Sequence, residues 1–203
     1  SKVPSSVTLA DAKADNSATA LYAYLISLRE SDQVLFGHEN DINKMVSSTA
    51  TEGDVKEVTR SLSGIYGIDT LSLTGAELGL TDQEVALNTA IANSIKAAEG
   101  GSIISLSSHM PNFTNEKITV NADGSYNFTA CDFSESKDVS NNCAELILPG
   151  GAYNDRFTAY LDIIAEYAKA LQEKDIPILF RTYHENTGSW FWWGSATSEE
   201  TYK

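Results

Sequence analysis

The segment from Arg181 to Gly194 combines acidic, amide and aromatic side chains in a pattern that suits carbohydrate chemistry. All three tryptophans of the chain lie in it, close to Glu185, Asn186 and Ser189. Flat aromatic rings cover the apolar faces of sugar rings, while polar groups bind sugar hydroxyls. A carboxyl group held against apolar rings is desolvated and stays protonated, as a general acid must. Glu185 is therefore the candidate acid, although core packing explains some of the rings equally well.

A polar residue ends each of four short apolar runs. These residues are His38, Asp69, His109 and the pair His184–Glu185. The carboxyl ends of parallel strands meet on one side of a β/α fold, where barrel enzymes have their active sites. Each residue alone is more simply explained as structural. The agreement of four strand ends predicts a shared site.

The elements that would position these residues alternate along the chain. We expect strands at Gln33–His38, Gly64–Asp69, Ser102–His109 and Pro177–Glu185. Helices are expected at about Thr8–Arg29, Asp54–Leu62, Thr81–Glu99 and Asp155–Lys174, with another opening at Thr197–Glu200. Thr81 and Glu84 fit a capping box. Residues 111–151 form a long polar insertion with a hairpin at 117–128 that turns at Asp123–Gly124.

Four strand–helix units in a row predict an α/β fold with parallel strands. Two architectures compete, a doubly wound open sheet and half of a (β/α)8 barrel. No glycine-rich phosphate loop follows any strand, which makes a nucleotide-binding fold less favoured.

The motif His184-Glu185-Asn186-Thr187-Gly188-Ser189-Trp190-Phe191-Trp192-Trp193-Gly194 resembles the acid/base motif of glycoside hydrolase family 26, in its β-mannanase branch. Three further segments match the family: Leu35-Phe36-Gly37-His38, Ser107-Ser108-His109-Met110-Pro111-Asn112 and Leu148-Pro149-Gly150-Gly151. The resemblance covers nearly the whole chain.

This resemblance implies a (β/α)8 TIM barrel, of which the chain supplies about the first four βα units. It also implies retaining endo-hydrolysis of β-1,4-mannan, galactomannan or glucomannan, without a cofactor or metal. The family's acid/base matches Glu185, and its substrate-binding residues match His109, His184 and Trp190. Ser108 stands where many relatives have tryptophan, and Glu39 stands where glutamine is common. These two departures concern sugar subsites rather than the chemistry.

Retaining hydrolysis needs a second carboxylate, about 5–5.5 Å from the first, as the nucleophile. In the family it is a glutamate near the seventh strand, and the four strands of this chain do not include that position. Asp69 and Glu77 lie near the second strand, but their surroundings resemble no nucleophile motif. We therefore expect residues 1–203 to be the N-terminal portion of one catalytic domain, whose remainder supplies the nucleophile.

Three alternative functions remain open at this stage. The same machinery could act on mixed-linkage β-glucan or β-1,3-xylan. A degenerate barrel could bind glycans without hydrolysing them. A metal-dependent hydrolase could use His38, His109 and His184, although paired ligands on one strand, as in His-x-His, do not occur here.

The composition limits the possible partners and the compartment. The net charge of −14 disfavours nucleic acid and anionic membrane surfaces. No apolar run approaches the roughly 18 residues of a membrane span. No secretory leader is visible at residues 1–13, so we expect that any leader has been removed. Cys131 and Cys143 could form one disulfide, which would suit a secreted or cell-surface protein; two unpaired thiols are the alternative.

Overall fold

The computed structural model describes residues 7–203. Residues 1–6, which belong to the segment 1–13 where no secretory leader is visible, lie outside the described residues. Four parallel strands form one sheet in the order β1-β2-β3-β6. Their bounds are β1 Gly37–Glu39, β2 Ile65–Asp69, β3 Ile103–Ser107 and β6 Ile178–Arg181. The expected α/β fold with parallel strands is therefore confirmed. Each of the four strands lies next to the one that precedes it in this sheet along the chain.

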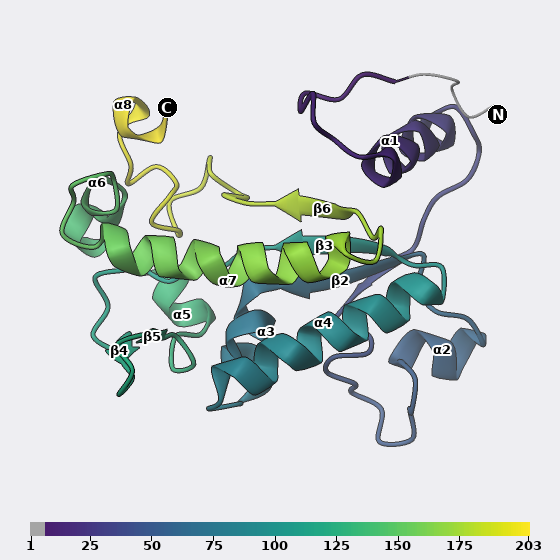
Figure 1. Cartoon of the computed structure of the whole chain (residues 1–203), viewed down its shortest axis with the longest axis horizontal. Coiled ribbons are helices and arrows are strands. Elements are labelled where there is room, and N and C mark those ends of the chain that lie inside the picture. Colours follow the sequence, from purple (N-terminus) through teal and green to yellow (C-terminus); the bar gives the residue numbers. More distant parts are fainter. Residues whose placement is uncertain (1–6) are drawn as a thin grey trace.

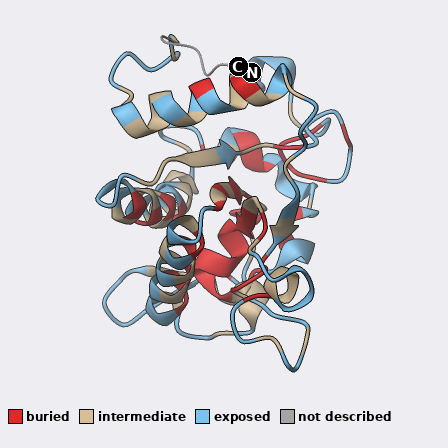
Figure 2. Ribbon diagram, turned by 90° about the vertical axis from the view of Figure 1, so that its right-hand side faces the viewer, coloured by how far each residue is buried: buried red, intermediate tan, exposed pale blue. Residues whose placement is uncertain are grey.

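Helices precede, connect and follow these strands along the chain. They are α1 Asn16–Arg29, α2 Asp54–Thr59, α3 Thr70–Thr74, α4 Gln83–Glu99, α5 Phe133–Ser136, α6 Cys143–Leu146, α7 Asn154–Gln172 and α8 Glu199–Tyr202. Short 3-10 helices occur at η1 Ala76–Leu78 and η2 Ser140–Asn142. Helices α4 and α7 lie side by side over the sheet (Figure 1). Their apolar sides and the strands beneath them form the core, which Figure 2 shows as buried residues gathered in the middle of the molecule.

Alternation along the strands gives the sheet two unlike faces. Tyr66 and Ile68 of β2 and Ile104 and Leu106 of β3 are almost fully buried toward the helices. Toward the carboxyl ends of the strands, the opposite face carries mainly small or polar residues, in the rows Glu39–Gly67–Ser105–Leu179 and Asp69–Ser107–Arg181. The polar strand ends of this second face build the site described below.

Two helix starts differ from the sequence expectation. Helix α1 begins at Asn16 rather than near Thr8, because the Asp15 side chain caps it by accepting from the Ala18 N–H at 2.8 Å. Helix α4 begins at Gln83, since Asp82 and not Thr81 accepts from the Val85 N–H at 3.1 Å. The expected Thr81–Glu84 capping box is therefore wrong: Asp82 is the N-cap, and Val85, three residues later, has no side-chain acceptor to complete a box.

All four strands are shorter than expected, and the first and the last differ most. The run Gln33–Phe36 is not a buried strand, as Val34 is 93% and Phe36 62% exposed. β1 is an edge strand that pairs with β2 over three residues, so little of the run is covered. β6 ends at Arg181, because Tyr183 and Glu185 adopt positive φ values of 47° and 56° that no strand accommodates.

The insertion at 111–151 is more than a polar loop. The expected hairpin is present as β4 Thr119–Val120 and β5 Tyr126–Asn127. Phe113 and Phe128 are fully buried, with ring centroids 5.7 and 5.0 Å from that of Tyr160 on α7. Cys131 and Cys143 are buried free thiols, so the expected disulfide is wrong in this structure. The insertion is fastened to the domain by this apolar packing.

Candidate active site

Asp69 is the most tightly held acidic residue at the strand ends. It is 4% exposed, ends β2 and caps α3. Its Oδ1 accepts from the N–H groups of Leu71 at 3.0 Å and His109 at 3.2 Å. Its Oδ2 accepts from Ser107 Oγ at 2.6 Å and His109 Nδ1 at 2.8 Å. With every lone pair directed at a donor, this carboxylate is built to hold other groups rather than to attack a substrate.

His109 connects Asp69 to a second histidine. Its Nδ1 faces Asp69, and its Nε2 lies 3.0 Å from Nε2 of His184. Burial favours the neutral form of His109, but the hydrogen bond and charge of Asp69 outweigh burial and raise its pKa. Burial of Asp69 is likewise outweighed, and the bonds from His109 and Ser107 lower the pKa of that carboxyl. Each partner of this contact therefore favours the charged form of the other.

His184 is buried among aromatic rings. Its ring centroid lies 5.5 Å from that of Phe191 and 5.8 Å from that of Trp193, and Phe191 and Trp193 stack at 4.4 Å. Burial, followed by the neighbouring His109, lowers the pKa of His184. The two histidines thus bond to each other through their Nε2 atoms.

Glu185 follows His184 but turns away from the core. Its carboxyl is exposed, and Oε2 accepts from the indole N–H of Trp190 at 2.8 Å. Trp190 is itself 48% exposed, so the carboxyl and a broad ring face present themselves together at the surface. The expected desolvation of the Glu185 carboxyl by packed rings is therefore wrong. The indole of Trp190 alone positions this carboxyl.

Two glycines let the Trp190 segment fold so closely. A methyl group at Gly188 would lie 2.5 Å from Cζ2 of Trp190, and one at Gly194 would lie 2.4 Å from the Gly188 carbonyl oxygen. The remaining indoles anchor the segment, since Trp192 donates to the Met110 carbonyl at 3.0 Å and Trp193 to the His184 carbonyl at 2.8 Å. The spacing of glycine and tryptophan in this motif is thus a packing requirement.

A second acidic group lies beside the Asp69 cluster. Glu39 at the end of β1 extends over Gly67, where a Cβ would come within 2.3 Å of its Oε2. Burial of the carboxyl, with the charges of Asp69 and Glu77, raises the pKa of Glu39 to about 7. Glu77 accepts from Ser72 Oγ at 2.7 Å. Sequence reasoning treated Glu39 only as a departure from relatives; its pairing with Gly67 becomes visible once the strand register is known.

His38 does not join the cluster. It pairs with Tyr66, whose side chain points to the helices, and its Nδ1 lies 3.9 Å from Asp41 Oδ1. The predicted convergence therefore holds for Asp69, His109 and His184–Glu185 but is wrong for His38. Within residues 7–203, no group of three or more histidine, cysteine, aspartate or glutamate side chains is arranged to hold a metal ion. Nor does any helix in that range have the length and apolar character to cross a membrane.

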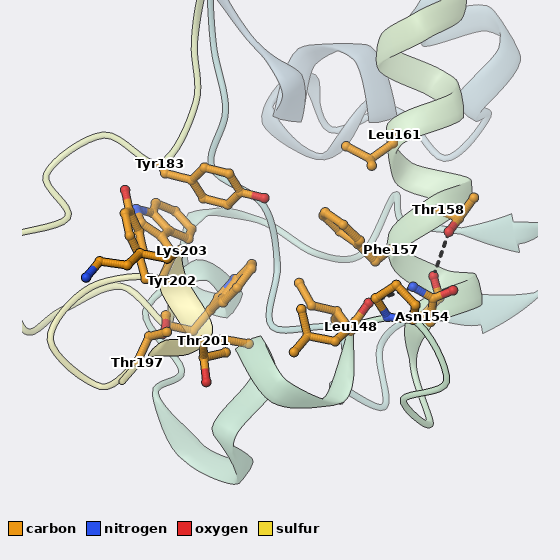
Figure 3. A pocket seen from close by; sticks show the side chains of 15 residues that line it. Leu148, Asn154, Phe157, Thr158, Leu161, Tyr183, Thr197, Thr201, Tyr202 and Lys203 are labelled. Carbon is orange, nitrogen blue, oxygen red and sulfur yellow. Dashed lines mark hydrogen bonds between the residues drawn. The ribbon is translucent and has the colours of Figure 1, made fainter. Parts of the chain in front are cut away.

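A separate apolar cavity of about 460 Å³ lies between α6, α7 and α8 (Figure 3). Phe157 and Leu161 of α7 face Tyr183 and Tyr202 across it. It has few polar groups, and neither His109 nor Glu185 lines it. The chemistry-bearing residues therefore gather at the strand ends and not in this cavity.

Known proteins are similar to this chain in sequence and fold. A mannan endo-1,4-beta-mannosidase of Bifidobacterium adolescentis is 34% identical over 205 residues, 98% of this chain and 19% of that protein. A modular endo-beta-1,4-mannanase structure from Cellulomonas fimi is 31% identical, with a TM-score of 0.76 over 95% of this chain and 41% of that one. The catalytic domain of an endo-beta-1,4-mannanase from Bacillus sp. JAMB-750 is 30% identical, with a TM-score of 0.77 over 97% of this chain and 50% of that one.

The chain thus spans from about a fifth to half of these relatives. The family model described as Glycosyl hydrolase family 26 matches residues 10–203. Because this match takes in nearly the whole described chain, the chain belongs to glycosyl hydrolase family 26.

Proposed function

We propose that this chain is part of a retaining endo-β-1,4-mannanase in which Glu185 is the general acid/base. The observation that carries the proposal is the exposed carboxyl of Glu185, held by the indole N–H of Trp190 at 2.8 Å. A carboxyl fixed beside an open aromatic face can reach a glycosidic oxygen while the ring carries the sugar. The relatives named above are described as mannanases, which supports mannan as the substrate.

In this proposal Glu185 donates its proton to the leaving oxygen and later takes a proton from the attacking water. Trp190 provides the stacking surface. His109 and His184 line the site from the ends of β3 and β6, with the partly exposed ring edge of His109 available to substrate. Their ring nitrogens already bond to each other and to Asp69, so they contribute shape and charge around the sugar.

The nucleophile belongs, in this proposal, to the remainder of the same domain. Asp69 is unsuited to attack because both of its oxygens are saturated with donors. Residues 1–203 would supply about the first four βα units of a (β/α)8 barrel. Two features support this: the matched region is half or less of the two solved relatives named above, and β6 pairs with β3 alone within the described sheet. The apolar cavity beside α8 is suited to further packing of the same domain.

A polysaccharide substrate also accounts for the expected secreted or cell-surface location, because such polymers do not enter cells. The acidic surface suits a neutral polymer. A substrate panel of mannan, galactomannan, glucomannan, mixed-linkage β-glucan and β-1,3-xylan identifies the glycan. Binding of mannan without hydrolysis would instead favour a glycan-binding protein.

The experiment that tests the proposal compares Glu185→Gln with the unsubstituted full-length protein. Reducing-sugar release from galactomannan should fall by roughly 10²–10⁴-fold, the usual contribution of acid–base catalysis. An aryl mannoside with an acidic leaving group, which needs no proton, should show a much smaller loss in its first step. Glu166→Gln, on the exposed side of α7, is the matched control and should keep full activity. Equal activity of Glu185→Gln and Glu166→Gln on galactomannan would reject the assignment.

A further inference from the structure

Three side chains from different strand ends form one line of hydrogen bonds. Asp69 ends β2, His109 follows β3 and His184 follows β6. The distances are 2.8 Å from Asp69 Oδ2 to His109 Nδ1 and 3.0 Å between the Nε2 atoms of the two histidines. This line lies at the carboxyl ends of the strands. The two contact distances determine how many protons the two histidines can hold.

The first contact fixes one proton. The Ser107 hydroxyl and two backbone N–H groups already donate to Asp69, so its carboxylate acts as an acceptor. The hydrogen of the 2.8 Å contact must then reside on His109 Nδ1. His109 is thereby held in one orientation and one tautomer when it is neutral.

The second contact admits a single proton. Two Nε2 atoms at 3.0 Å can share one hydrogen, but two N–H groups at that distance would collide. With His109 neutral, His184 carries the hydrogen on Nε2 and its Nδ1 is a bare lone pair. When His109 gains a proton on Nε2, His184 must accept it with Nε2 and move its own hydrogen to Nδ1. Charge and proton number balance with one added proton on the pair.

The environment of His184 suits a neutral ring. Its Nδ1 is buried and has no hydrogen-bond partner among residues 7–203. An imidazolium there would leave a charged donor unpaired, which costs more than an unpaired acceptor. The remaining charges that act on the pair are those of Glu39, Glu77 and Glu185 on His109, and those of Arg181 and Glu185 on His184. The acidic groups favour a positive charge on His109. On His184, the charges of His109 and Arg181 oppose a positive charge more than Asp69 and Glu185 favour it.

We propose that Asp69 is a positioning residue of this site, which fixes the Nδ1 proton of His109 and makes His109 and His184 a coupled pair that holds at most one positive charge. His184 stays neutral and changes tautomer when His109 is protonated. The structural part of this inference stands on the contacts alone, while its effect on catalysis rests on the proposed function. Whenever the pair is protonated, its charge would therefore lie on His109.

The test is a titration of the histidine ring nitrogens by ¹⁵N NMR in the full-length protein. This chain contributes three histidines, so His109→Gln and His184→Gln assign the signals and His38 is the internal control. At pH 8, His109 should be the Nδ1–H tautomer and His184 the Nε2–H tautomer. Toward pH 5 the pair should take up one proton, on His109, while His184 changes to the Nδ1–H tautomer.

Asp69→Asn tests the role of the carboxylate. Asparagine keeps an oxygen to cap α3 but removes the charge, so the midpoint of His109 should fall by about 1–3 pKa units, with the signals of His38 unmoved. Should Asp69→Asn fail to fold, the tautomers of the unsubstituted protein still decide the matter. A bare Nδ1 on His109 at pH 8, two imidazolium rings above pH 5, or an unchanged His109 midpoint in Asp69→Asn would each overturn the proposal.

An activity measurement separates this inference from the proposed function. In Asp69→Asn, the pH at which kcat/KM for mannan changes should move in the same direction as the His109 midpoint. Loss of the NMR pattern with normal dependence on Glu185 would reject the coupled pair alone. The NMR pattern without any loss in Glu185→Gln would reject the proposed function alone.

Discussion

Gly188→Ala gives the sharpest test of how the motif loop positions its exposed indole. Gly188 is buried under Trp190, and the backbone there does not need positive φ. Alanine is therefore acceptable to the backbone, and only the added methyl group matters. That methyl would lie 2.5, 2.6 and 2.7 Å from three carbon atoms of the Trp190 ring.

The size of the disturbance follows from these distances. Ordinary contact begins at 3.4 Å, so the ring must retreat by 3.4 − 2.5, or about 0.9 Å. The backbone of Gly188 is held in place, because its carbonyl accepts from the Ser195 N–H at 2.9 Å. The Trp190 ring is therefore the part that moves. A misplacement of about 1 Å can cost roughly 10²-fold in catalysis. The 2.8 Å bond to Glu185 should break as the indole shifts.

The assay is kcat/KM for galactomannan with the full-length protein, in a double-mutant cycle with Trp190→Ala. Gly188→Ala should lose about 10²-fold when Trp190 is present. In the Trp190→Ala background the methyl meets no ring, and the further loss should be less than about threefold. Quenching of tryptophan fluorescence by acrylamide should increase in Gly188→Ala, because the displaced Trp190 ring becomes more exposed to solvent.

Two results would refute this reasoning. Equal losses from Gly188→Ala in both backgrounds would mean that the methyl acts on the backbone and not on the ring. Full activity of Gly188→Ala with unchanged quenching would mean that the loop makes room without moving Trp190.

Three further predictions follow from the site and the insertion. Trp190→Phe keeps an aromatic ring but removes the N–H that holds Glu185. Because one hydrogen bond to a charged group is lost, kcat should fall about tenfold with a smaller change in KM. An unchanged kcat would contradict this prediction. The pKa of Glu39 is raised from 4.5 to about 7 by burial and neighbouring carboxylates, so its folded-state ionisation reduces stability as pH rises between these values. Glu39→Gln should therefore raise the denaturation midpoint at pH 8 and leave it nearly unchanged at pH 4, and the opposite order would refute the assignment. Burial raises the pKa of Cys131 and Cys143 to about 12; peptide mapping after unfolding and alkylation without reductant should find both thiols modified, whereas a disulfide-linked peptide pair would contradict the structure.

The sequence pattern predicts the sheet well because strand–helix alternation is a local property. Short apolar runs bounded by polar residues located all four parallel strands, and their shared carboxyl ends predicted that Asp69, His109 and His184 would meet. The error at His38 has a simple cause. Successive residues of a strand face opposite ways, and the register that decides which residue faces the site depends on the partner strand.

Features that depend on long-range contacts could not be read from the sequence. Phe113 and Phe128 lie in a polar-looking insertion, and nothing local indicates that both contact Tyr160. The early end of β6 at Arg181 has a similar origin. Its continuation is folded back by the Trp193 bond to the His184 carbonyl, which overrides a strongly β-forming sequence.

The three indole donors of the motif, Trp190, Trp192 and Trp193, have a consequence for the thermodynamics of ligand binding. Each indole N–H donates to a different acceptor, so the segment that carries Trp190 is held in one conformation before any ligand binds. Ordering one free side chain on binding costs about 0.5–1.5 kcal/mol in entropy. A ring whose rotamer is already set avoids most of that loss. For any ligand that stacks on Trp190, association should then be governed by diffusion and dehydration of the ring face, without a slow rearrangement of the loop.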